Sequence, residues 1–369
     1  MPLALLVTQD LQRAGAQRQC VELARGLARR DGWRVEVATL EAGGPLEAEL
    51  RADGIPLHHW PRRFRWDLAP AFALARHVRR IRPDVVQTFL FLPNFYGRVA
   101  RLLARPRLLV SSLRSTGIEG WPRYAAEVLL APLCDLVLAN SDAGRDDLVA
   151  RGVARRRVVV VRNGMAFERF DAVRASAPPP SRCGARLGMV AQMERRKDHA
   201  GLVEAFARVR AARPEARLTL AGDGSLRPLV QERARRLGLD GAVEMPGTVE
   251  RPEGILATLA IYVQASAAEE GTSNAILEAM ACGRPVVATD IGGNREVVEP
   301  GRTGVVVPAR DPERLAGAIL DLLGDPARLD AMGDAAARSV RARFARDAMI
   351  EATLAAWSGV PGRAPGAPA

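Results

Sequence analysis

The sequence is almost without lysine. Of its 53 lysines and arginines, Lys197 alone is a lysine. A P-loop needs a lysine that follows glycine and precedes serine or threonine, but Lys197 stands between Arg196 and Asp198. A nucleoside triphosphatase of that type is therefore excluded. An enzyme that binds pyridoxal phosphate as a Schiff base also needs a lysine, so only Lys197 could serve in that role.

Cysteine and metal-binding motifs are also scarce. The 4 cysteines lie far apart, form no C-x-x-C pair and have no histidine at zinc spacing. This pattern favours a reducing compartment over a disulfide framework. No D-x-D and no H-E-x-x-H motif occurs, which predicts no metal site, and the lack of G-x-G-x-x-G leaves dinucleotide binding without support.

Long apolar runs are missing as well. The longest apolar stretch, residues 125–140, contains Glu127, Pro132 and Asp135 and is not a membrane span. The first residues, MPLALLVTQD, have no basic segment ahead of the apolar one, so we expect no signal peptide. The expected location is the cytoplasm.

The sequence has an ordinary globular composition, with 48% hydrophobic and 26% charged residues, but its charge is unevenly divided. Residues 1–175 hold 28 arginines against 18 acidic residues, while residues 176–369 hold 25 cations against 24 acidic residues. This asymmetry predicts that the first half meets an anionic partner, such as a membrane surface or nucleic acid.

Short β-branched runs alternate with longer helical patterns in both halves of the chain, which predicts parallel sheets built from βαβ units. The expected strands are 3–8, 35–40, 85–88, 108–112, 136–139, 158–161, 187–191, 218–221, 243–245, 261–264, 286–289 and 304–307. The expected helices include 17–30 and 69–81. Three consecutive prolines in the segment 176–184 interrupt this alternation. We predict an α/β protein of two doubly wound, Rossmann-like domains that face each other across a cleft.

These interruptions define the expected domains. The first domain spans 1–175, a linker spans 176–185 and the second domain spans 186–345. A C-terminal helix, 346–358, is expected to pack back on the first domain, and the tail 359–369 is expected to be disordered because it has no core-forming residues. Ligands of open α/β sheets bind at the carboxyl ends of the strands, so the functional residues are expected there.

The strongest candidate site follows the strand expected at 261–264. Gly271, Thr272 and Ser273 suit a turn and a helix N-cap, and a helix is expected over 274–281. The N-terminus of a helix offers unpaired N–H groups and a partial positive charge, so it stabilises a phosphate.

Two glutamates flank this helix start. Glu270 and Glu278 have seven residues between them, which puts one carboxylate on the loop and the other inside the helix. They can therefore reach different parts of an elongated ligand, and carboxylates accept hydrogen bonds from sugar hydroxyls. Two glutamates alone would more often be ordinary surface acids, because glutamate is common on helices.

The residues around the glutamates form a longer pattern. It comprises Glu270, Glu278, the EAMA at 278–281, Gly283, Pro285, Val286, Val287 and the pair Gly292–Gly293. Five more segments belong to it: AQMERRKDH, AGDGSLRPLV, VEMPGTVE, RTGVVVP and RNGMAFERF. This pattern resembles the nucleotide-sugar site of the family-4 retaining glycosyltransferases, which have the two-domain GT-B architecture. The resemblance covers nearly the whole second domain and, more thinly, the first.

The resemblance implies roles for individual residues. Glu270 would contact the transferred sugar near the reacting centre, and Glu278 would hold the ribose hydroxyls. Lys197 matches the family's diphosphate-binding lysine, and a compact ammonium there can neutralise the leaving diphosphate. Glu270 and Lys197 are thus the expected catalytic residues. The other expected donor-binding residues are Gly271, Thr272, Ser273, Asn274, Gln192, Gly222 and Gly15.

Three positions depart from the family's pattern. Gln192 stands where an arginine is usual, and Arg195 or Arg196 could either substitute for it or be solvated. Gly15 lies in a first loop that reads RAGA where two adjacent glycines are common. The usual histidine at a strand end of the first domain is missing, and Arg114 is the candidate that replaces it on the acceptor side.

The 4 histidines and one asparagine have simpler interpretations. His58, His59, His77 and His199 are each expected at the surface, outside the catalytic machinery. Asn163 follows a strand, as in the family's Asn-Gly turn, and is expected to be a structural hinge element.

The segment 58–83 mixes Trp60, Phe64 and Trp66 with seven arginines. Such a mixture can lie at a membrane surface, where arginines meet lipid phosphates and rings meet the acyl boundary. A nucleic-acid face and a solvated basic face over core aromatics are the other interpretations.

We therefore expect a retaining, metal-independent glycosyltransferase. It would move a hexose-type sugar from a nucleoside diphosphate donor, most simply UDP-linked, to a hydroxyl of a glycan, a lipid-linked acceptor or a small molecule, as in polysaccharide biosynthesis. The second domain would bind the donor and the first the acceptor, with no cofactor and with peripheral contact to the inner face of an anionic membrane. Nucleic acid is not an expected partner. Two alternatives remain: an epimerase or phosphorylase of the same architecture, and a non-catalytic protein that binds nucleotide sugars or nucleic acid.

Overall fold

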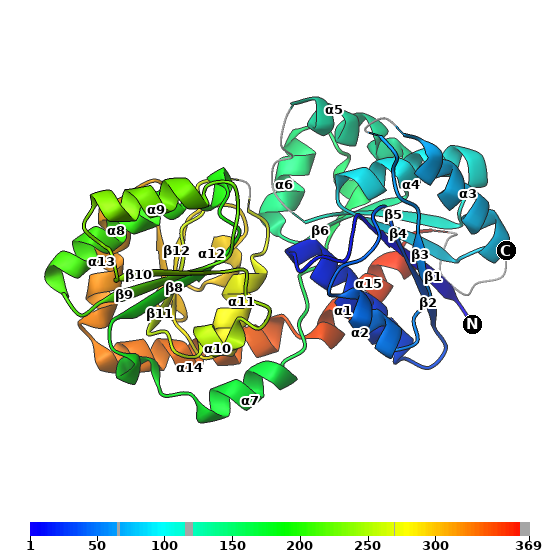
Figure 1. Cartoon of the computed structure of the whole chain (residues 1–369). Helices are drawn as coiled ribbons and strands as arrows, with labels where there is room; N and C mark the ends of the chain where they lie inside the picture. The colour runs from blue at the N-terminus through cyan, green and yellow to red at the C-terminus, as the bar shows by residue number, and fades with distance from the viewer. Residues whose placement is uncertain (65–66, 115–120, 269, 362–369) are drawn as a thin grey trace. The chain divides into compact units, whose positions relative to one another are not determined.

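The computed structural model describes residues 1–64, 67–114, 121–268 and 270–361 (Figure 1). Trp66 and residues 362–369 of the expected tail lie outside the described residues. The chain forms two compact units, Met1–Met165 with Phe344–Ala369 and Ala166–Arg343, so it passes from one unit to the other twice.

The segment 176–185, which was expected to be a linker, belongs to the second unit. It includes the short 3-10 helix Pro180–Cys183, whose two end residues are buried. The backbone N–H of Ser181 donates to Asp330 Oδ1 at 2.8 Å, and Arg284 Nη2 donates to the carbonyl of Pro178 at 2.9 Å. These bonds hold the proline-rich segment against the unit.

The N-terminal unit contains a sheet of seven parallel strands in the order β3-β2-β1-β4-β5-β6-β7. The strands are β1 (Leu3–Thr8), β2 (Arg34–Thr39), β3 (Leu57–His59), β4 (Val85–Phe89), β5 (Leu108–Leu113), β6 (Leu136–Ala139) and β7 (Val158–Val160). The expected doubly wound parallel sheet is confirmed. Strand β3 was not predicted, because it is three residues long and carries two histidines in place of an apolar run.

Helices cover both faces of this sheet. They are α1 (Gly15–Ala28), α2 (Glu47–Ala52), α3 (Ala69–Ile81), α4 (Phe91–Ala104), α5 (Trp121–Leu130), α6 (Asp142–Ala150) and α15 (Arg346–Ser358). Successive strand residues point to opposite faces, and the core divides accordingly. Val35 and Val37 of β2 pack in the cluster that includes residues of α1 and α15, while Ala38 packs in the cluster that includes residues of α3 and α4.

Helix α15 completes the first of these clusters. Ile350 and Trp357 are fully buried in it, and the Trp357 ring lies 5.5 Å from that of Trp33. The indole Nε1 donates to Oε1 of Gln87 on β4 at 2.9 Å. Gly26 of α1 allows this packing, because a Cβ there would lie 2.1 Å from Cδ1 of Ile350.

The second unit contains a sheet of six parallel strands in the order β10-β9-β8-β11-β12-β13. The strands are β8 (Arg186–Val190), β9 (Arg217–Ala221), β10 (Val243–Gly247), β11 (Ile261–Gln264), β12 (Val286–Thr289) and β13 (Gly304–Val307). The helices are α7 (Glu168–Ser176), α8 (His199–Ala212), α9 (Arg227–Arg236), α10 (Glu253–Leu256), α11 (Asn274–Ala281), α12 (Asn294–Val297), α13 (Pro312–Leu323) and α14 (Pro326–Arg343). All six expected strands are present in this unit.

Both sheets reverse their strand order at one point, between β1 and β4 in the first unit and between β8 and β11 in the second. Ligands of doubly wound sheets bind outside the carboxyl ends of the strands at such a reversal. The loops after β8 and β11 are therefore the first place to look for a site. Among the described residues, no helix combines the length and the apolar character needed to cross a membrane.

Candidate functional site

A buried ion pair lies at the strand reversal of the second unit. The chain leaves β8, forms a short 3-10 helix at Arg195–Lys197 and enters α8, while the loop after β11 leads to Glu270. Lys197 Nζ donates to Glu270 Oε2 at 2.6 Å, and the two residues are 7% and 6% exposed. The structure thus brings together the two residues that the sequence predicted to be catalytic.

A chain of hydrogen bonds along β11 fixes the Glu270 carboxylate. Ser266 Oγ donates to Glu270 Oε2 at 2.7 Å, and Gln264 Nε2 donates to Ser266 Oγ at 2.9 Å. The hydroxyl of Tyr262 donates to Gln264 Oε1 at 2.8 Å. Sequence reasoning missed these three residues, although their spacing of two along a buried strand puts them on one face.

Burial shifts the pKa of Lys197 and of its neighbour His199. It lowers the pKa of Lys197, while the Glu270 carboxylate raises it and Arg196 lowers it further. Burial, followed by the Lys197 charge, lowers the pKa of His199 to about 4, so this imidazole is neutral at pH 7. The Lys197 ammonium thus has the Glu270 carboxylate as its ion-pair partner, and a phosphate placed there would compete with Glu270 for the ammonium.

Helix α11 begins at Asn274, as predicted, directly after the buried residues Thr272 and Ser273. Ser273 occupies the N-cap position but its hydroxyl makes no capping bond, and it lies 3.5 Å from Gln264 Oε1. The first turn of any helix carries backbone N–H groups that have no carbonyl partner within the helix, which gives this end a partial positive charge. Gly271, the remaining predicted loop residue, is buried beside them.

Glu278 lies within α11 and is partly buried. Its Oε1 accepts a hydrogen bond from Arg169 Nη2 of α7 at 3.2 Å. Arg169 was not predicted as a partner, because it is more than one hundred residues away in the sequence. The two glutamates of the motif therefore have different cationic neighbours, Lys197 for Glu270 and Arg169 for Glu278.

Two glycines bring the loop after β9 against the loop after β8. Gly222 has a φ of +143°, and a Cβ there would lie 1.9 Å from the carbonyl oxygen of Ala191. Gly224 has a φ of +156°, and its Cβ would lie 2.6 Å from the carbonyl of Met193. Gln192, between these contacts, is exposed. The predicted residues Gly222 and Gln192 thus lie on adjoining loops at the carboxyl edge of the sheet.

The N-terminal unit holds the other two predicted residues. Gly15 opens α1 after β1 and is exposed. Arg114 follows β5, and its Nη1 donates to Oδ1 of the buried Asn163 at 3.0 Å. The backbone at Leu90, directly after β4, has a φ of +75°, which strains a residue that bears a Cβ.

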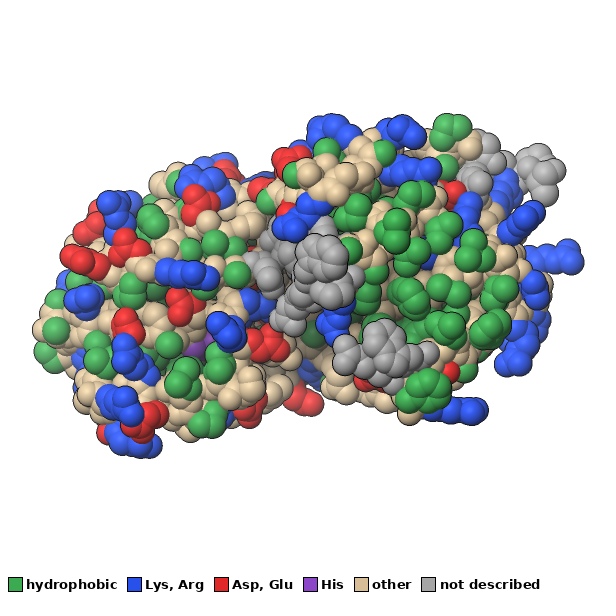
Figure 2. Space-filling view, turned by 90° about the horizontal axis from the view of Figure 1, so that it is seen from above, with side chains coloured by type: hydrophobic (Ala, Val, Ile, Leu, Met, Phe, Trp, Pro, Cys, Tyr) green, Lys and Arg blue, Asp and Glu red, His purple; other side chains and the backbone are tan. Residues whose placement is uncertain are grey.

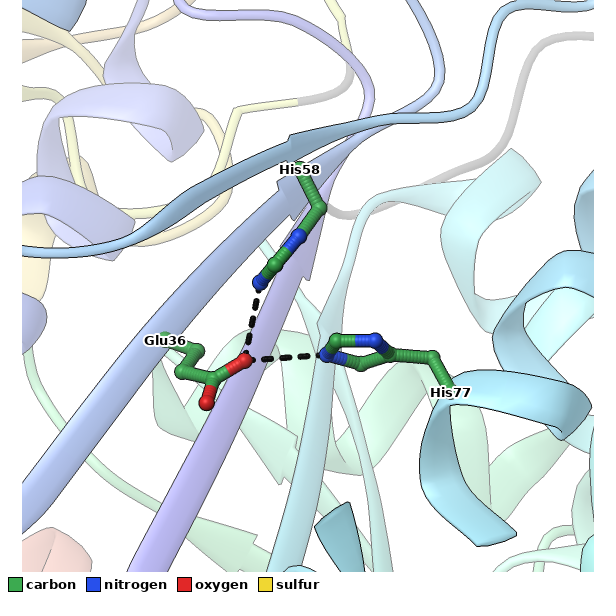
Figure 3. A group of neighbouring side chains, drawn as sticks. All are labelled: Glu36, His58 and His77. Carbon is green, nitrogen blue, oxygen red and sulfur yellow. Dashed lines mark hydrogen bonds and ion pairs between the residues drawn. The ribbon is translucent and has the colours of Figure 1, made fainter. Parts of the chain in front are cut away.

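The surface positions expected for the histidines are wrong for His77 and His199, which are 6% and 3% exposed. Figure 3 shows the reason for His77. The carboxylate of Glu36 on β2 lies between two imidazoles, and its Oε2 accepts from Nε2 of His58 at 2.8 Å and of His77 at 2.9 Å. A buried glutamate needs such partners. This shared hydrogen bonding could not be predicted when each histidine was considered separately.

This trio is also the one group among the described residues whose ligand atoms lie close enough to hold a metal ion, within 4.8 Å of one another. Arg80 Nη2 lies 2.9 Å from Nδ1 of His77. Arginine can only donate, so Nδ1 accepts and the ring proton lies on Nε2, where it is donated to Glu36. The trio is a satisfied hydrogen-bond network that joins α3 to β2 and β3.

Comparisons with known proteins identify the family. Residues 13–169 match a family model described as "Glycosyltransferase Family 4", and residues 184–325 match one described as "Glycosyl transferases group 1". Among curated proteins, the D-inositol 3-phosphate glycosyltransferase of Kineococcus radiotolerans is 33% identical over 96% of this chain and 92% of its own. A GDP-mannose-dependent monoacylated α-(1-6)-phosphatidylinositol monomannoside mannosyltransferase of Corynebacterium glutamicum is 36% identical over 42% of each chain.

Solved structures agree on the fold. HepE of Anabaena, solved in complex with UDP and glucose, superposes with a TM-score of 0.83 at 21% identity, over 96% of this chain and 99% of its own. A sucrose-phosphate synthase of Thermosynechococcus elongatus superposes with a TM-score of 0.78 at 21% identity, over 96% and 97% of the two chains. With its two doubly wound sheets and a relative 33% identical over nearly its whole length, the chain belongs to glycosyltransferase family 4 and has the GT-B architecture.

Proposed function

We propose that this glycosyltransferase is retaining and metal-independent, and that its second unit binds a nucleoside diphosphate hexose. The observation that carries the proposal is the buried contact of 2.6 Å between Lys197 and Glu270 beside the start of α11. A lysine ammonium and a helix N-terminus are two sources of positive charge that suit a diphosphate. Glu278, inside the same helix, supplies a carboxylate for the ribose hydroxyls.

The chemistry follows from the charge that develops during transfer. The bond between the anomeric carbon and the β-phosphate oxygen breaks, and the electron pair leaves with the diphosphate. Lys197 and the N-terminus of α11 stabilise this charge in place of a metal ion. The acceptor hydroxyl attacks the same face of the sugar and its proton passes to the departing phosphate, so the anomeric configuration is retained. Glu270 orients the sugar at the reacting carbon.

UDP is the proposed donor nucleotide. The structural neighbour HepE was solved with UDP and glucose, whereas the name of the Corynebacterium relative specifies GDP-mannose. A donor screen by thermal unfolding separates these cases, because a bound donor stabilises the fold by mass action. We expect a UDP-hexose to raise the Tm and GDP-mannose to leave it unchanged; the reverse result would replace UDP by GDP.

The catalytic assignment is tested by initial rates with the donor found in that screen. Glu270→Gln should abolish transfer, and Lys197→Arg should impair it although the charge is kept, because the planar guanidinium does not fit the space of a compact ammonium. Glu232→Gln is the control, since this glutamate lies on α9 of the same unit and pairs with Arg235 and Arg236. Full activity of Glu270→Gln, or loss of activity in EDTA, would contradict the proposal.

We further propose that the N-terminal unit contacts an anionic membrane while the enzyme acts on a glycan, a lipid-linked acceptor or a small molecule. Figure 2 shows hydrophobic side chains gathered on one face of this unit, with arginines around them. Phe64 and Phe72, in the basic segment around the start of α3, are 63% and 58% exposed, and Leu102 of the adjoining helix α4 is 64% exposed. Apolar side chains rimmed by arginines suit the interface of an anionic bilayer.

Vesicle flotation tests this contact. The protein should float with vesicles that contain phosphatidylglycerol and remain unbound to vesicles of phosphatidylcholine alone. Phe72→Ser should weaken the binding, whereas Leu229→Ser should not, because Leu229 has the same exposed fraction of 58% but lies on α9 of the second unit. Equal binding by both variants would remove this face from the proposal.

A further inference from the structure

Arg114 is held at the carboxyl edge of the N-terminal sheet by its neighbours. Its Nη1 donates to Asn163 Oδ1 at 3.0 Å, and its guanidinium carbon lies 5.3 Å from the centre of the Phe89 ring at the end of β4. Its own carbonyl accepts from Asn140 Nδ2 after β6 at 3.2 Å. Neighbours on three strand ends thus fix both the side chain and the backbone.

The charge of this guanidinium has no acidic partner among the described residues. In the same unit Arg98 pairs with Glu127, and Arg101 pairs with Asp135 at 2.6 Å, so those two arginines have acidic partners. Arg114 instead contacts an amide and an aromatic ring, and the titratable group that acts on its charge is the thiol of Cys20, whose pKa burial raises to about 12. The thiol is therefore neutral at pH 7 and supplies no counter-charge.

One edge of the guanidinium is also without a hydrogen-bond acceptor. The Nε atom is buried and makes no hydrogen bond within the described part of the chain, and only Nη1 is engaged by Asn163. Nε and Nη2 form the side of the arginine fork that binds two oxygens of a carboxylate or phosphate at once. A buried polar group without a partner costs free energy, and burial lowers the pKa of Arg114 to about 10, so the charge is kept at pH 7.

We infer that Arg114 is the anion-binding residue of the acceptor site and that it receives a phosphate or carboxylate group of the acceptor through Nε and Nη2. Arg114 follows β5, the neighbour of β4, so it lies one strand from the reversal between β1 and β4, outside which ligands of doubly wound sheets bind. The inference rests on the proposed function in one respect, namely that the bound anion belongs to the acceptor substrate of a glycosyltransferase. It assigns a chemical class, an anionic hydroxyl compound, to a site that the sequence indicated only as an acceptor-side contact.

Inorganic phosphate is the probe that tests the site. Thermal unfolding is followed while phosphate replaces chloride at constant ionic strength, in the presence of saturating UDP, which occupies the diphosphate position of the second unit. The wild type should be stabilised by phosphate. Arg114→Gln should lose this response and keep its response to UDP, and Arg114→Lys, which retains the charge without the fork, should bind phosphate about tenfold more weakly.

Arg162→Gln is the matched control, because Arg162 lies on the same unit but pairs with Asp142 at 2.8 Å. It should respond to phosphate as the wild type does. A phosphate response of Arg114→Gln equal to that of the wild type would overturn the inference, and so would a selective loss of its UDP response, which would assign Arg114 to the donor. If Arg114→Gln does not fold, Arg114→Lys decides in the same way.

The same titrations separate this inference from the proposed function. A wild type that binds phosphate through Arg114 but does not respond to UDP or any other nucleotide would refute the donor proposal and leave the anion site standing. A normal UDP response with a phosphate response independent of Arg114 would refute the anion site alone. With acceptors that differ only in a phosphate group, Arg114→Gln should raise the KM for the phosphorylated acceptor by a larger factor than the KM for the other.

Discussion

Each of the two units holds a cation at the carboxyl edge of a parallel sheet, but only the cation of the second unit has an acidic partner among the described residues. In the second unit Lys197 lies 2.6 Å from Glu270, and a chain of polar residues from β11 fixes that carboxylate. In the first unit the Arg114 guanidinium contacts the amide of Asn163 and the ring of Phe89, and it has no ion pair with an acidic residue in the described part of the chain. The first arrangement is complete without a ligand, and the second becomes complete only when an anion binds.

This difference separates two ways of preparing a site. A paired ammonium is held in position before the ligand arrives, and the ligand must displace part of its contact with the carboxylate. An unpaired guanidinium gives its full attraction to the ligand but lowers the stability of the empty protein. Variants that remove one group at a time should reveal this difference as opposite effects on stability.

The largest effect is expected for Lys197→Met. It leaves Glu270 buried without its cation, which should cost about 3–5 kcal/mol of unfolding free energy and reduce transfer by about 10³-fold. Urea unfolding and initial rates measure the two losses. The double variant Lys197→Met/Glu270→Gln should recover most of the stability and none of the activity. Arg114→Gln, in contrast, should not lower the unfolding free energy of the ligand-free protein. A decrease as large as that of Lys197→Met would contradict the proposed difference between a paired cation in the second unit and an unpaired one in the first.

The next largest effect is a loss of unfolding free energy at low pH, and we expect it to arise from His199 in the second unit. The pKa of His199 is about 4 in the folded protein and near 6.5 when the chain is unfolded. The unfolded chain alone binds the proton between these values, so the contribution of His199 is complete above pH 6.5 and is lost as the pH falls towards 4. The loss amounts to about 3 kcal/mol at most. Urea unfolding from pH 7.5 to 4.5 should therefore be steeper in pH for the wild type than for His199→Leu, and parallel curves would contradict this assignment.

The smallest effect tests the backbone that supports the paired site. Gly222→Ala puts a Cβ 1.9 Å from the carbonyl of Ala191 at a φ that favours glycine, so the loop must shift. The expected loss is about 1–3 kcal/mol, together with a weaker response to the donor. Gly254→Ala is the control, since no atom lies within 4 Å of its Cβ. The phosphate response through Arg114 should be the same in both variants, because Gly222 supports the second unit only.

Much of the fold was predictable because its strands are short apolar runs with clear ends. Strands β6, β11, β12 and β13 and helix α3 have the expected bounds. Strand β3 was not predicted because Leu57–His59 has no apolar pattern. The burial of His77 was not predicted because its hydrogen-bond partner Glu36 lies 41 residues away in the sequence. The periodicity of apolar residues predicts which face of a helix or strand a residue lies on. It does not predict a polar partner on another element.

The site shows the same limit. The motif indicated Lys197, Glu270 and Glu278 by position, and their approach follows from the topology, since β8 and β11 are neighbours. The supporting contacts of Tyr262 and Arg169 depend on packing, so only the structure reveals them. The unpaired state of Arg114 is likewise a statement about all its neighbours at once, which no single motif contains.

Helix α15 has a consequence for how the chain acquires its structure during synthesis. The residues that fill the core between α1 and the sheet include Ile350 and Trp357, and the amide of the buried Gln87 takes its indole partner from the latter. A ribosome delivers these residues after the whole of Ala166–Arg343 has been made. The N-terminal unit is therefore begun first and completed last, and the second unit can fold while the core of the first still lacks Ile350 and Trp357.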